Sequence, residues 1–245
     1  MPRYFIEVSY KGTAYSGFQV QKNANSIQAE VEKALLIFYK QRFELTGSSR
    51  TDSGVHALQN YFHFDSEINI KDDAYNLNSI LPDDIVIKRV FSVDAAAHSR
   101  FDALSREYRY YIFNSKNPFL QDRACYFPYT LNIELMQQAA LEILKYSDFT
   151  SFSKRNTQVK SFLCDIYESE WIEEPGILVY KIKANRFLRG MVKGLVGTML
   201  QVGREKITLE EFKDIIRAKD CRRADFSVPS VGLFLYKVEF PDTLK

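Results

Sequence analysis

Cysteine, histidine and tryptophan are all scarce in this chain of 245 residues, which has three Cys, three His and one Trp. Cys125, Cys164 and Cys221 are odd in number and far apart. They predict no disulfide framework, and with so few histidines they give no zinc-like spacing. We therefore expect a reduced, cytoplasmic protein.

Long apolar runs are missing as well. No stretch approaches the roughly 18–20 apolar residues of a membrane span, and the N-terminal residues alternate like a strand without the apolar core of a signal peptide. Hydrophobic residues make up 46% and aromatic residues 14% of the chain. This composition predicts a soluble globular protein with one large domain or two smaller ones.

Common catalytic signatures are also missing. The chain has no phosphate-binding glycine loop, no dinucleotide fingerprint and no G-x-S-x-G nucleophile elbow. His56, His63 and His98 are scattered, and acidic residues do not cluster in the pairs that a two-metal site requires. The sequence thus gives no support for metal catalysis, a nucleotide cradle or a serine triad.

Charge is nearly balanced overall but unevenly distributed. The formal net charge is +2, yet residues 150–223 hold fifteen Lys and Arg against ten Asp and Glu, while the remainder holds eighteen against twenty-one. This asymmetry indicates a face for a polyanion in the C-terminal half, although solvated helices give a similar pattern.

Hydrophobic periodicity predicts an α+β protein. In the first hundred residues we expect strands over 4–10, 43–46, 60–65 and 85–93, a helix capped by Asn25 or Ser26, and a helix over 73–81. In the second half we expect strands over 105–113, 164–172, 177–184 and 232–240, and helices over 132–146, 187–202 and from 208. Each half follows a β-α-β-β-α-β order, which is ferredoxin-like. We predict two such halves, 1–103 and 104–245, sharing a mainly antiparallel sheet flanked by helices.

The segment Arg50–Ala57 joins two predicted strands and is the first candidate site. Asp-Ser-Gly favours a tight turn, so Arg50, Asp52 and Ser53 are presented together at the tip of rigid elements. Most such turns are only turns. The residues alone leave open whether this one is catalytic.

The strand around Tyr108 is the second candidate. Tyr108 and Tyr110 share one face and Arg109 lies on the other. A tyrosine on a sheet can stack on a nucleobase and a neighbouring arginine can hold phosphates, but a core-facing tyrosine row is the alternative, more so for Tyr110. Arg100 is likewise either a phosphate contact or an ordinary surface cation.

The segment 187–202 is the third candidate. Arg189 and Lys193 are four residues apart, which would place them on one face of an apolar helix. Three glycines within it would cost roughly 1 kcal/mol each, so another segment is expected to approach its backbone closely. The cations either snorkel from a tightly packed helix or reach a buried acid, for which Asp52 is the natural candidate.

Three motifs follow one another along the chain: RTDSGVHA, REYRYYI and RFLRGMVKGLVGT. Three further motifs are YKGTAYSGFQVQ, DFTSF and GLFLYKVEF. With these motifs the chain resembles the tRNA pseudouridine synthase A family from end to end. The resemblance implies the pseudouridine synthase fold and the isomerisation of uridine to pseudouridine at positions 38, 39 and 40 of the tRNA anticodon stem-loop. It also implies a homodimer, with neither a metal nor an organic cofactor.

By position within these motifs, the resemblance makes Asp52 the catalytic aspartate. Arg50 would help to hold the target base out of the stack, and Tyr108 would stack on the flipped uracil and take part in removal of the C5 proton. Arg100, Arg109, Arg189 and Lys193 complete the expected substrate-binding set. A carboxylate can serve as nucleophile toward C1′ or C6, or as base at C2′, and the sequence does not choose among these.

Two positions depart from the family pattern. Ser48 and Ser49 stand where the family has Ala-Gly or similar, and Lys193 stands where it generally has Arg. Lys offers a point charge, whereas Arg offers a bidentate fork. The departure at Lys193 keeps open a catalytically silent tRNA-binding protein or RNA chaperone. A third hypothesis is a retaining glycosidase, which needs two carboxylates, and no second carboxylate is evident in the motifs.

Overall fold

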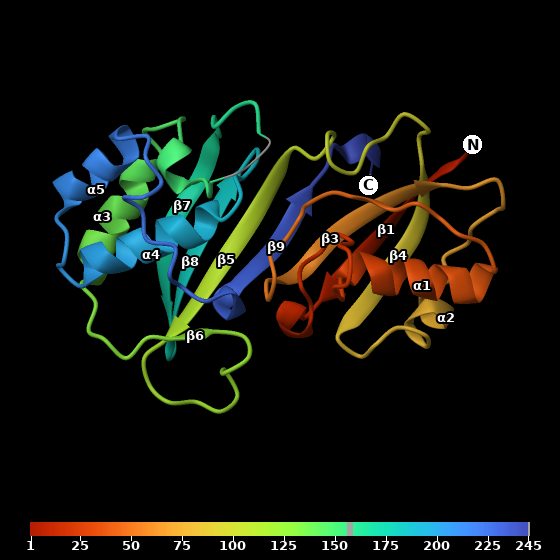
Figure 1. Ribbon diagram of the computed structural model, residues 1–245, viewed down its shortest axis with the longest axis horizontal. Coiled ribbons are helices and arrows are strands. Elements are labelled where there is room, and N and C mark those ends of the chain that lie inside the picture. Colours follow the sequence, from red (N-terminus) through yellow and green to blue (C-terminus); the bar gives the residue numbers. More distant parts are fainter. Residues whose placement is uncertain (156–158, 245) are drawn as a thin grey trace. The chain divides into compact units, whose positions relative to one another are not determined.

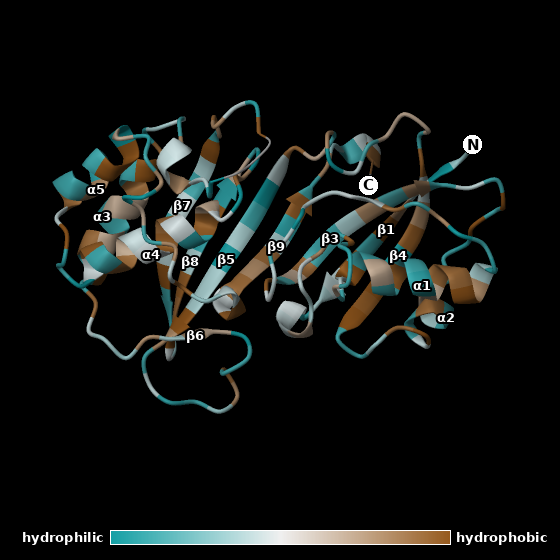
Figure 2. Cartoon of the chain, viewed as in Figure 1, coloured by the Kyte–Doolittle hydropathy of each residue, from teal (hydrophilic) through white to brown (hydrophobic). Residues whose placement is uncertain are grey.

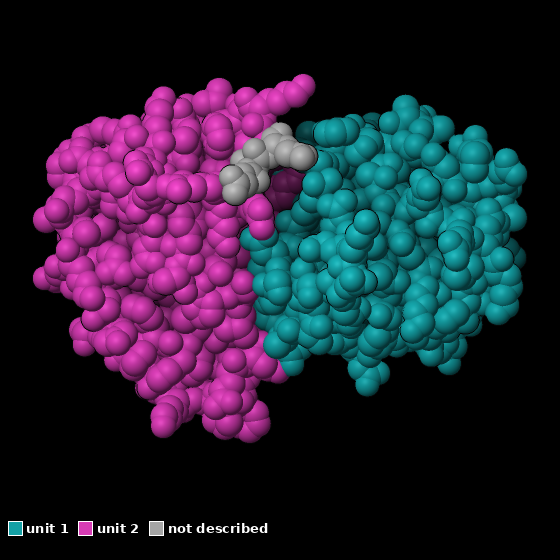
Figure 3. All heavy atoms as spheres, viewed as in Figure 1, with its two compact units in different colours: residues 1–105, 234–245 teal, residues 106–233 magenta. Residues whose placement is uncertain are grey.

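The computed structural model describes residues 1–155 and 159–244. They form two compact units, which Figure 3 distinguishes by colour. Unit 1 comprises Met1–Ser105 and Phe234–Lys245, and unit 2 comprises Arg106–Leu233. The chain passes from unit 1 to unit 2 after Ser105, whereas the sequence predicts a boundary after residue 103. The last strand is grouped with the N-terminal part of the chain.

Unit 1 is built on an antiparallel sheet to which the C-terminal strand is added. Its strands are β1 (Arg3–Tyr10), β2 (Thr46–Gly47), β3 (His56–Asp65), β4 (Ile85–Val93) and β9 (Leu233–Glu239). β1 pairs antiparallel with both β3 and β4, and β9 pairs parallel with β3 through His56 opposite Phe234. This pairing explains why the chain's last strand belongs to unit 1.

The helices of unit 1 begin where side-chain chemistry predicts. α1 (Ile27–Tyr39) starts at Ser26, whose hydroxyl accepts a hydrogen bond from the Ala29 amide at 3.3 Å, as expected for an N-cap. α2 (Ala74–Asn78) packs against β4, and Figure 1 shows α1 lying across the strands of this sheet. Two short 3₁₀ helices span Gly12–Ala14 and Asp242–Leu244.

The strand expected over 43–46 is mostly absent. Only Thr46–Gly47 pairs, opposite His63 and Phe62. Phe43 and Leu45 are nevertheless buried, and the Phe43 ring packs edge-on against Phe64 with centroids 4.9 Å apart. Their alternation reflects core packing without a hydrogen-bonded ladder.

Unit 2 has its own antiparallel strands and three longer helices. β5 (Ser105–Phe113) pairs with β8 (Ile177–Ala184), and β8 pairs with β7 (Ile166–Glu174); the short β6 (Cys125–Tyr126) runs parallel to β5. The helices are α3 (Ile133–Ile143), α4 (Met191–Gly203) and α5 (Leu209–Arg217), and 3₁₀ turns span Thr150–Phe152 and Ser230–Gly232.

The helix caps of unit 2 follow the sequence. Asn132 accepts from the Leu135 amide at 3.2 Å at the start of α3. Thr208 and Glu211 form the predicted capping box at the start of α5. Figure 2 shows hydrophilic and hydrophobic residues mixed along α5, and its buried residues are Phe212, Ile215 and Ile216. The α+β class with mainly antiparallel strands is confirmed.

The glycine-containing helix begins later than predicted. α4 starts after Gly190, which caps it with φ 74°, and residues 187–189 lie outside the helix. A positive φ is available to glycine without steric cost, so Gly190 ends the preceding loop. Arg189 and Lys193 therefore do not share a helix face, and that prediction was wrong.

The expected close approach to this helix is confirmed. A Cβ on Gly197 would lie 2.2 Å from the Asp225 carbonyl oxygen, and one on Gly194 would lie 2.7 Å from the Phe226 ring. The segment that follows α5 thus packs directly on the α4 backbone. Among the described residues, no helix is both long and apolar enough to cross a membrane.

His63 makes the stability of unit 1 sensitive to acid. Its Nδ1 lies 2.8 Å from the Ser99 hydroxyl in a buried position. Burial, followed by the nearby His98 and Arg3 and against the opposing Asp65 and Asp102, lowers the pKa of His63 to about 4. Because the unfolded pKa is about 6.5, the folded state resists protonation, and stability present above pH 6.5 is lost as the pH falls toward 4.

We expect the free energy of unfolding of the wild type to fall more between pH 7 and pH 5 than that of His63→Gln. Glutamine can retain a hydrogen bond to Ser99 but does not titrate. Urea unfolding at both pH values measures the difference. An equal pH dependence in the two proteins would contradict this role for His63.

Candidate active site

The Asp52 turn adopts the tight geometry that the sequence predicts. Gly54 has φ 76°, and the Val55 amide donates to the Asp52 carbonyl at 3.2 Å. Asp52 is half-buried, whereas Arg50 and Ser53 are exposed. The turn leads directly into β3, so a carboxylate is displayed at the end of a sheet strand.

The segment from Gly12 to Phe18 holds this turn from one side. The Phe18 amide donates to the Thr51 carbonyl at 3.1 Å, and the Gly54 amide donates to the Tyr15 carbonyl at 3.3 Å. The Gly12 amide donates to His56 Nδ1 at 3.1 Å. These bonds flank Asp52 in sequence on both sides, so the carboxylate is presented by a constrained backbone.

A buried polar network holds the turn from the sheet side. The Tyr10 and Thr51 hydroxyls are 2.8 Å apart. Asn60 Nδ2 donates to the Tyr10 hydroxyl at 3.2 Å and to the Ser49 carbonyl at 2.8 Å. Burial raises the pKa of Tyr10, so its phenol stays protonated.

Sequence reasoning missed this network because Tyr10 fits an apolar strand pattern. Asn60 was the available signal, since an amide at a fully buried strand position needs hydrogen-bond partners. Asn60 bonds directly to Tyr10 and Ser49, and Tyr10 in turn bonds to Thr51, the residue before Asp52.

The two tyrosines on one face of β5 lie in different environments. Tyr110 is fully buried and donates to the Pro229 carbonyl at 2.8 Å, so it is a core residue. Tyr108 retains 8% exposure, and its ring packs edge-on against Phe187 with centroids 5.0 Å apart. Arg109 donates to Glu107 at 2.8 Å.

The remaining predicted cations lie at loop and helix starts. In unit 2, Arg189 is exposed just before α4 and Lys193 Nζ donates to the Ser230 hydroxyl at 3.4 Å from the first turn of α4. In unit 1, Arg100 is exposed and its guanidinium lies 5.7 Å from the centroid of the Phe101 ring. Of the predicted site residues in unit 1, Arg50 and Asp52 lie together on one turn.

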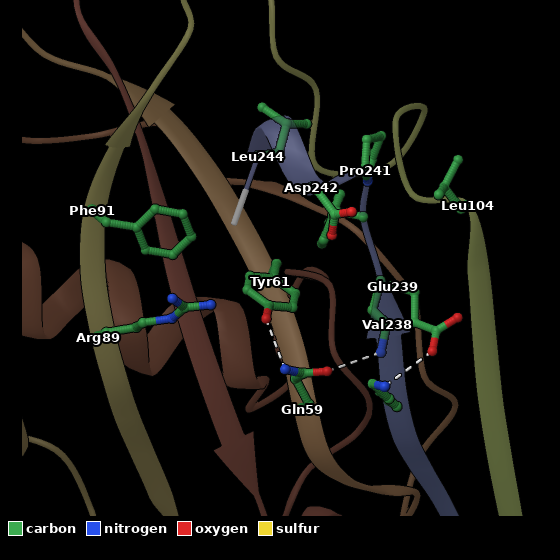
Figure 4. Close-up of a pocket in the computed structure, with 12 residues that line it drawn as sticks. Gln59, Tyr61, Arg89, Phe91, Leu104, Val238, Glu239, Pro241, Asp242 and Leu244 are labelled. Atoms are coloured by element: carbon green, nitrogen blue, oxygen red, sulfur yellow. Dashed lines mark hydrogen bonds and ion pairs between the residues drawn. The ribbon is translucent and has the colours of Figure 1, made fainter.

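A separate hollow of about 440 Å³ lies in unit 1 and is shown in Figure 4. Gln59 donates to the Tyr61 hydroxyl at 2.8 Å and accepts from the Val238 amide at 3.1 Å across it. Arg89 on its wall is paired with Glu7 at 2.7 Å. None of the predicted site residues lines this hollow.

The catalytic chemistry available at the turn is that of the Asp52 carboxylate. Within residues 1–155 and 159–244, no group of three or more His, Cys, Asp or Glu is placed to hold a metal ion. A constrained, half-buried aspartate can act as a nucleophile or as a base. Both actions depend on its being held in one orientation toward the reacting atom.

The chain is similar in sequence to known proteins. A model described as tRNA pseudouridine synthase matches residues 146–241. The tRNA pseudouridine synthase A of Parabacteroides distasonis is 42% identical over 247 residues, covering 100% of this chain and 98% of that protein. Those of Bacteroides thetaiotaomicron and Bacillus subtilis are 43% and 38% identical, covering 100% and 95% of this chain and 93% and 97% of theirs.

The matched segment, together with the full-length relatives, places the chain among the pseudouridine synthases. The identities over the whole chain show that it belongs to the tRNA pseudouridine synthase A family.

Proposed function

We propose that this protein is an isomerase that converts uridine to pseudouridine in tRNA, at positions 38, 39 and 40 of the anticodon stem-loop. The observation that supports this most directly is the Asp52 turn, held between the Gly12–Phe18 segment and the buried Tyr10–Asn60 network. Relatives of 38–43% identity that bear the name tRNA pseudouridine synthase A support the tRNA substrate.

The reaction conserves every atom of the uridine. The bond between C1′ and N1 breaks, the base rotates, and a bond between C1′ and C5 forms while C5 loses its proton and N1 gains one. Asp52 serves as the nucleophile toward C1′ or C6, or as the base at C2′; these alternatives stay open.

The uridine must first leave the helical stack. Flipping costs a few kcal/mol of lost stacking and pairing. In our proposal Arg50 occupies the space left by the base and Tyr108 stacks on the extruded uracil, which together offset that cost. Tyr108 also takes part in removing the C5 proton.

The remaining cations bind the tRNA backbone. In our proposal these are Arg100, Arg109, Arg189 and Lys193, and Lys193 additionally supports the charge of Asp52. Lys193 retains the positive charge of the usual arginine, which supports an active enzyme. We also propose a homodimer that works in the cytoplasm, where tRNA is processed, without a metal or organic cofactor.

Tritium release tests the proposed function. A tRNA transcript labelled at uridine C5 should release tritium with the wild-type protein, and a transcript with cytidine at positions 38, 39 and 40 should release none. Tight, salt-sensitive binding without release from any tRNA would instead favour the silent tRNA-binding protein. Release from both transcripts would place the modified uridine elsewhere.

A further inference from the structure

Unit 2 contains a second hollow, of about 240 Å³, between the 3₁₀ turn Thr150–Phe152 and the loop after α5. Its lining includes two hydroxyl side chains and three cations, contributed by Thr150, Ser153, Lys154, Arg155 and Lys219. Asp220 is the one acid among the lining residues. This hollow lies within the segment whose excess of Lys and Arg the sequence indicated.

The nearby acids are already neutralised by other groups. Asp148 accepts from Lys219 at 2.8 Å and from the Thr150 hydroxyl at 2.7 Å. Asp220 accepts two bonds from Arg222 Nε, at 2.8 and 2.9 Å.

Lys154 and Arg155 also face the hollow, and Arg155 is near enough to Asp220 to contribute to the lowered pKa of that carboxyl. Neither forms an ion pair with any residue that the structure describes. Their two positive charges therefore remain available to an anion from solution.

Lys154 is held in place by the protein around it. The Lys154 amide donates to the Arg189 carbonyl at 3.0 Å, and the aliphatic stem of Lys154 runs over Gly190, 3.0–3.1 Å from where a Cβ would stand. Behind the lining residue Asp220, the buried Ser151 hydroxyl accepts from the Asp220 amide at 3.0 Å and donates to the Ile215 carbonyl at 2.6 Å. The hollow thus has fixed walls and adjoins the start of α4.

We propose that this hollow, through Lys154 and Arg155 on its wall, binds a backbone phosphate of the tRNA substrate. The inference rests on the proposed function for its ligand. The volume is below the roughly 300–1,000 Å³ of pockets that enclose whole small molecules, so the site suits a group on a larger polyanion. Lys and Arg side chains are among the groups that contact phosphate oxygens in nucleic-acid complexes.

Salt dependence of tRNA binding tests the site. Each phosphate contact contributes about 0.7–0.9 to the slope of log affinity against log salt concentration. We expect Lys154→Gln and Arg155→Gln each to reduce that slope, and the double variant, which loses the single phosphate contact altogether, to reduce it by about 0.7–0.9. Between 50 and 200 mM salt, the loss of affinity should shrink by roughly threefold per contact.

Lys206→Gln is the matched control. Lys206 is an exposed cation of the same unit that does not line the hollow, and its removal changes the net charge equally. The salt slopes of Lys154→Gln and Arg155→Gln are compared with the slope of Lys206→Gln. The proposal would be overturned if all three variants differed from the wild type by the same amount. Unfolding midpoints of all variants are measured alongside, to ensure that folded proteins are compared.

Two further readouts separate this proposal from the proposed function. Binding slopes do not depend on turnover, so a wild-type protein that forms pseudouridine while the variant slopes stay unchanged would refute the phosphate site alone. Changed slopes without tritium release would support the site and refute the isomerase. Calorimetry measures the binding of inorganic phosphate to the wild type and to Lys154→Gln. If Lys154→Gln abolishes this binding but leaves the salt slope of tRNA binding unchanged, the hollow binds free phosphate and the proposal is overturned.

Discussion

Asp52→Asn is expected to abolish pseudouridine formation, lowering tritium release by at least about three orders of magnitude. The amide has nearly the shape of the carboxylate and also favours turns, so the fold of the segment should survive. It is neither an effective nucleophile nor a base at neutral pH. The measurement is tritium release from C5-labelled tRNA under single-turnover conditions.

The affinity for tRNA should be retained in Asp52→Asn, because the substitution removes a negative charge and leaves the cations in place. Asp83→Asn provides the control, since Asp83 is an exposed aspartate of the same unit and its loss changes the charge equally. Substantial release by Asp52→Asn would show that another group performs the chemistry. Equal losses in the two variants would point to a general effect of charge.

Gly12→Ala is expected to impair both stability and turnover. A Cβ at this position would lie 2.0 Å from the Val55 carbonyl oxygen, and a backbone atom cannot move aside as a flexible side chain can. Forcing in the methyl group should cost about 1–3 kcal/mol of unfolding free energy. The displaced backbone belongs to the Asp52 turn, so the catalytic rate should fall in the protein that remains folded.

Urea unfolding and single-turnover tritium release measure the two effects of Gly12→Ala. Gly176→Ala is the matched control, because Gly176 has φ 76° but nothing within 4 Å of an added Cβ. Its substitution should cost only the conformational strain of that φ and leave the rate unchanged. A wild-type rate in Gly12→Ala would contradict the role assigned to the backbone contact between Gly12 and Val55.

Local signals predicted most of the secondary structure correctly. The strands β4, β5 and β8 have the predicted bounds, and Ser26, Asn132 and Thr208 cap their helices as expected. These features depend on alternation and on short-range hydrogen bonds, both of which can be recognised within a few residues of sequence. The Asp52 turn belongs to the same group, since Gly54 adopts the positive φ that such a turn requires.

Features set by distant contacts were predicted less well. The start of α4 was placed too early because residues 187–189 are compatible with a helix, and the positive φ of Gly190 is visible only in the folded chain. The strand over 43–46 failed because burial of Phe43 and Leu45 produces the same alternation as a ladder.

The sequence by itself determined the α+β class, the helix caps and the identity of the candidate carboxylate, because each follows from neighbouring residues or from a specific motif. Only the tertiary structure decided what holds that carboxylate and what surrounds the C-terminal cations. Tyr10, Asn60 and Thr51 are joined by hydrogen bonds that span up to 50 positions in sequence. Lys154 and Lys219 are 65 positions apart yet line one hollow, because side chains so distant in the chain meet only when the core has packed.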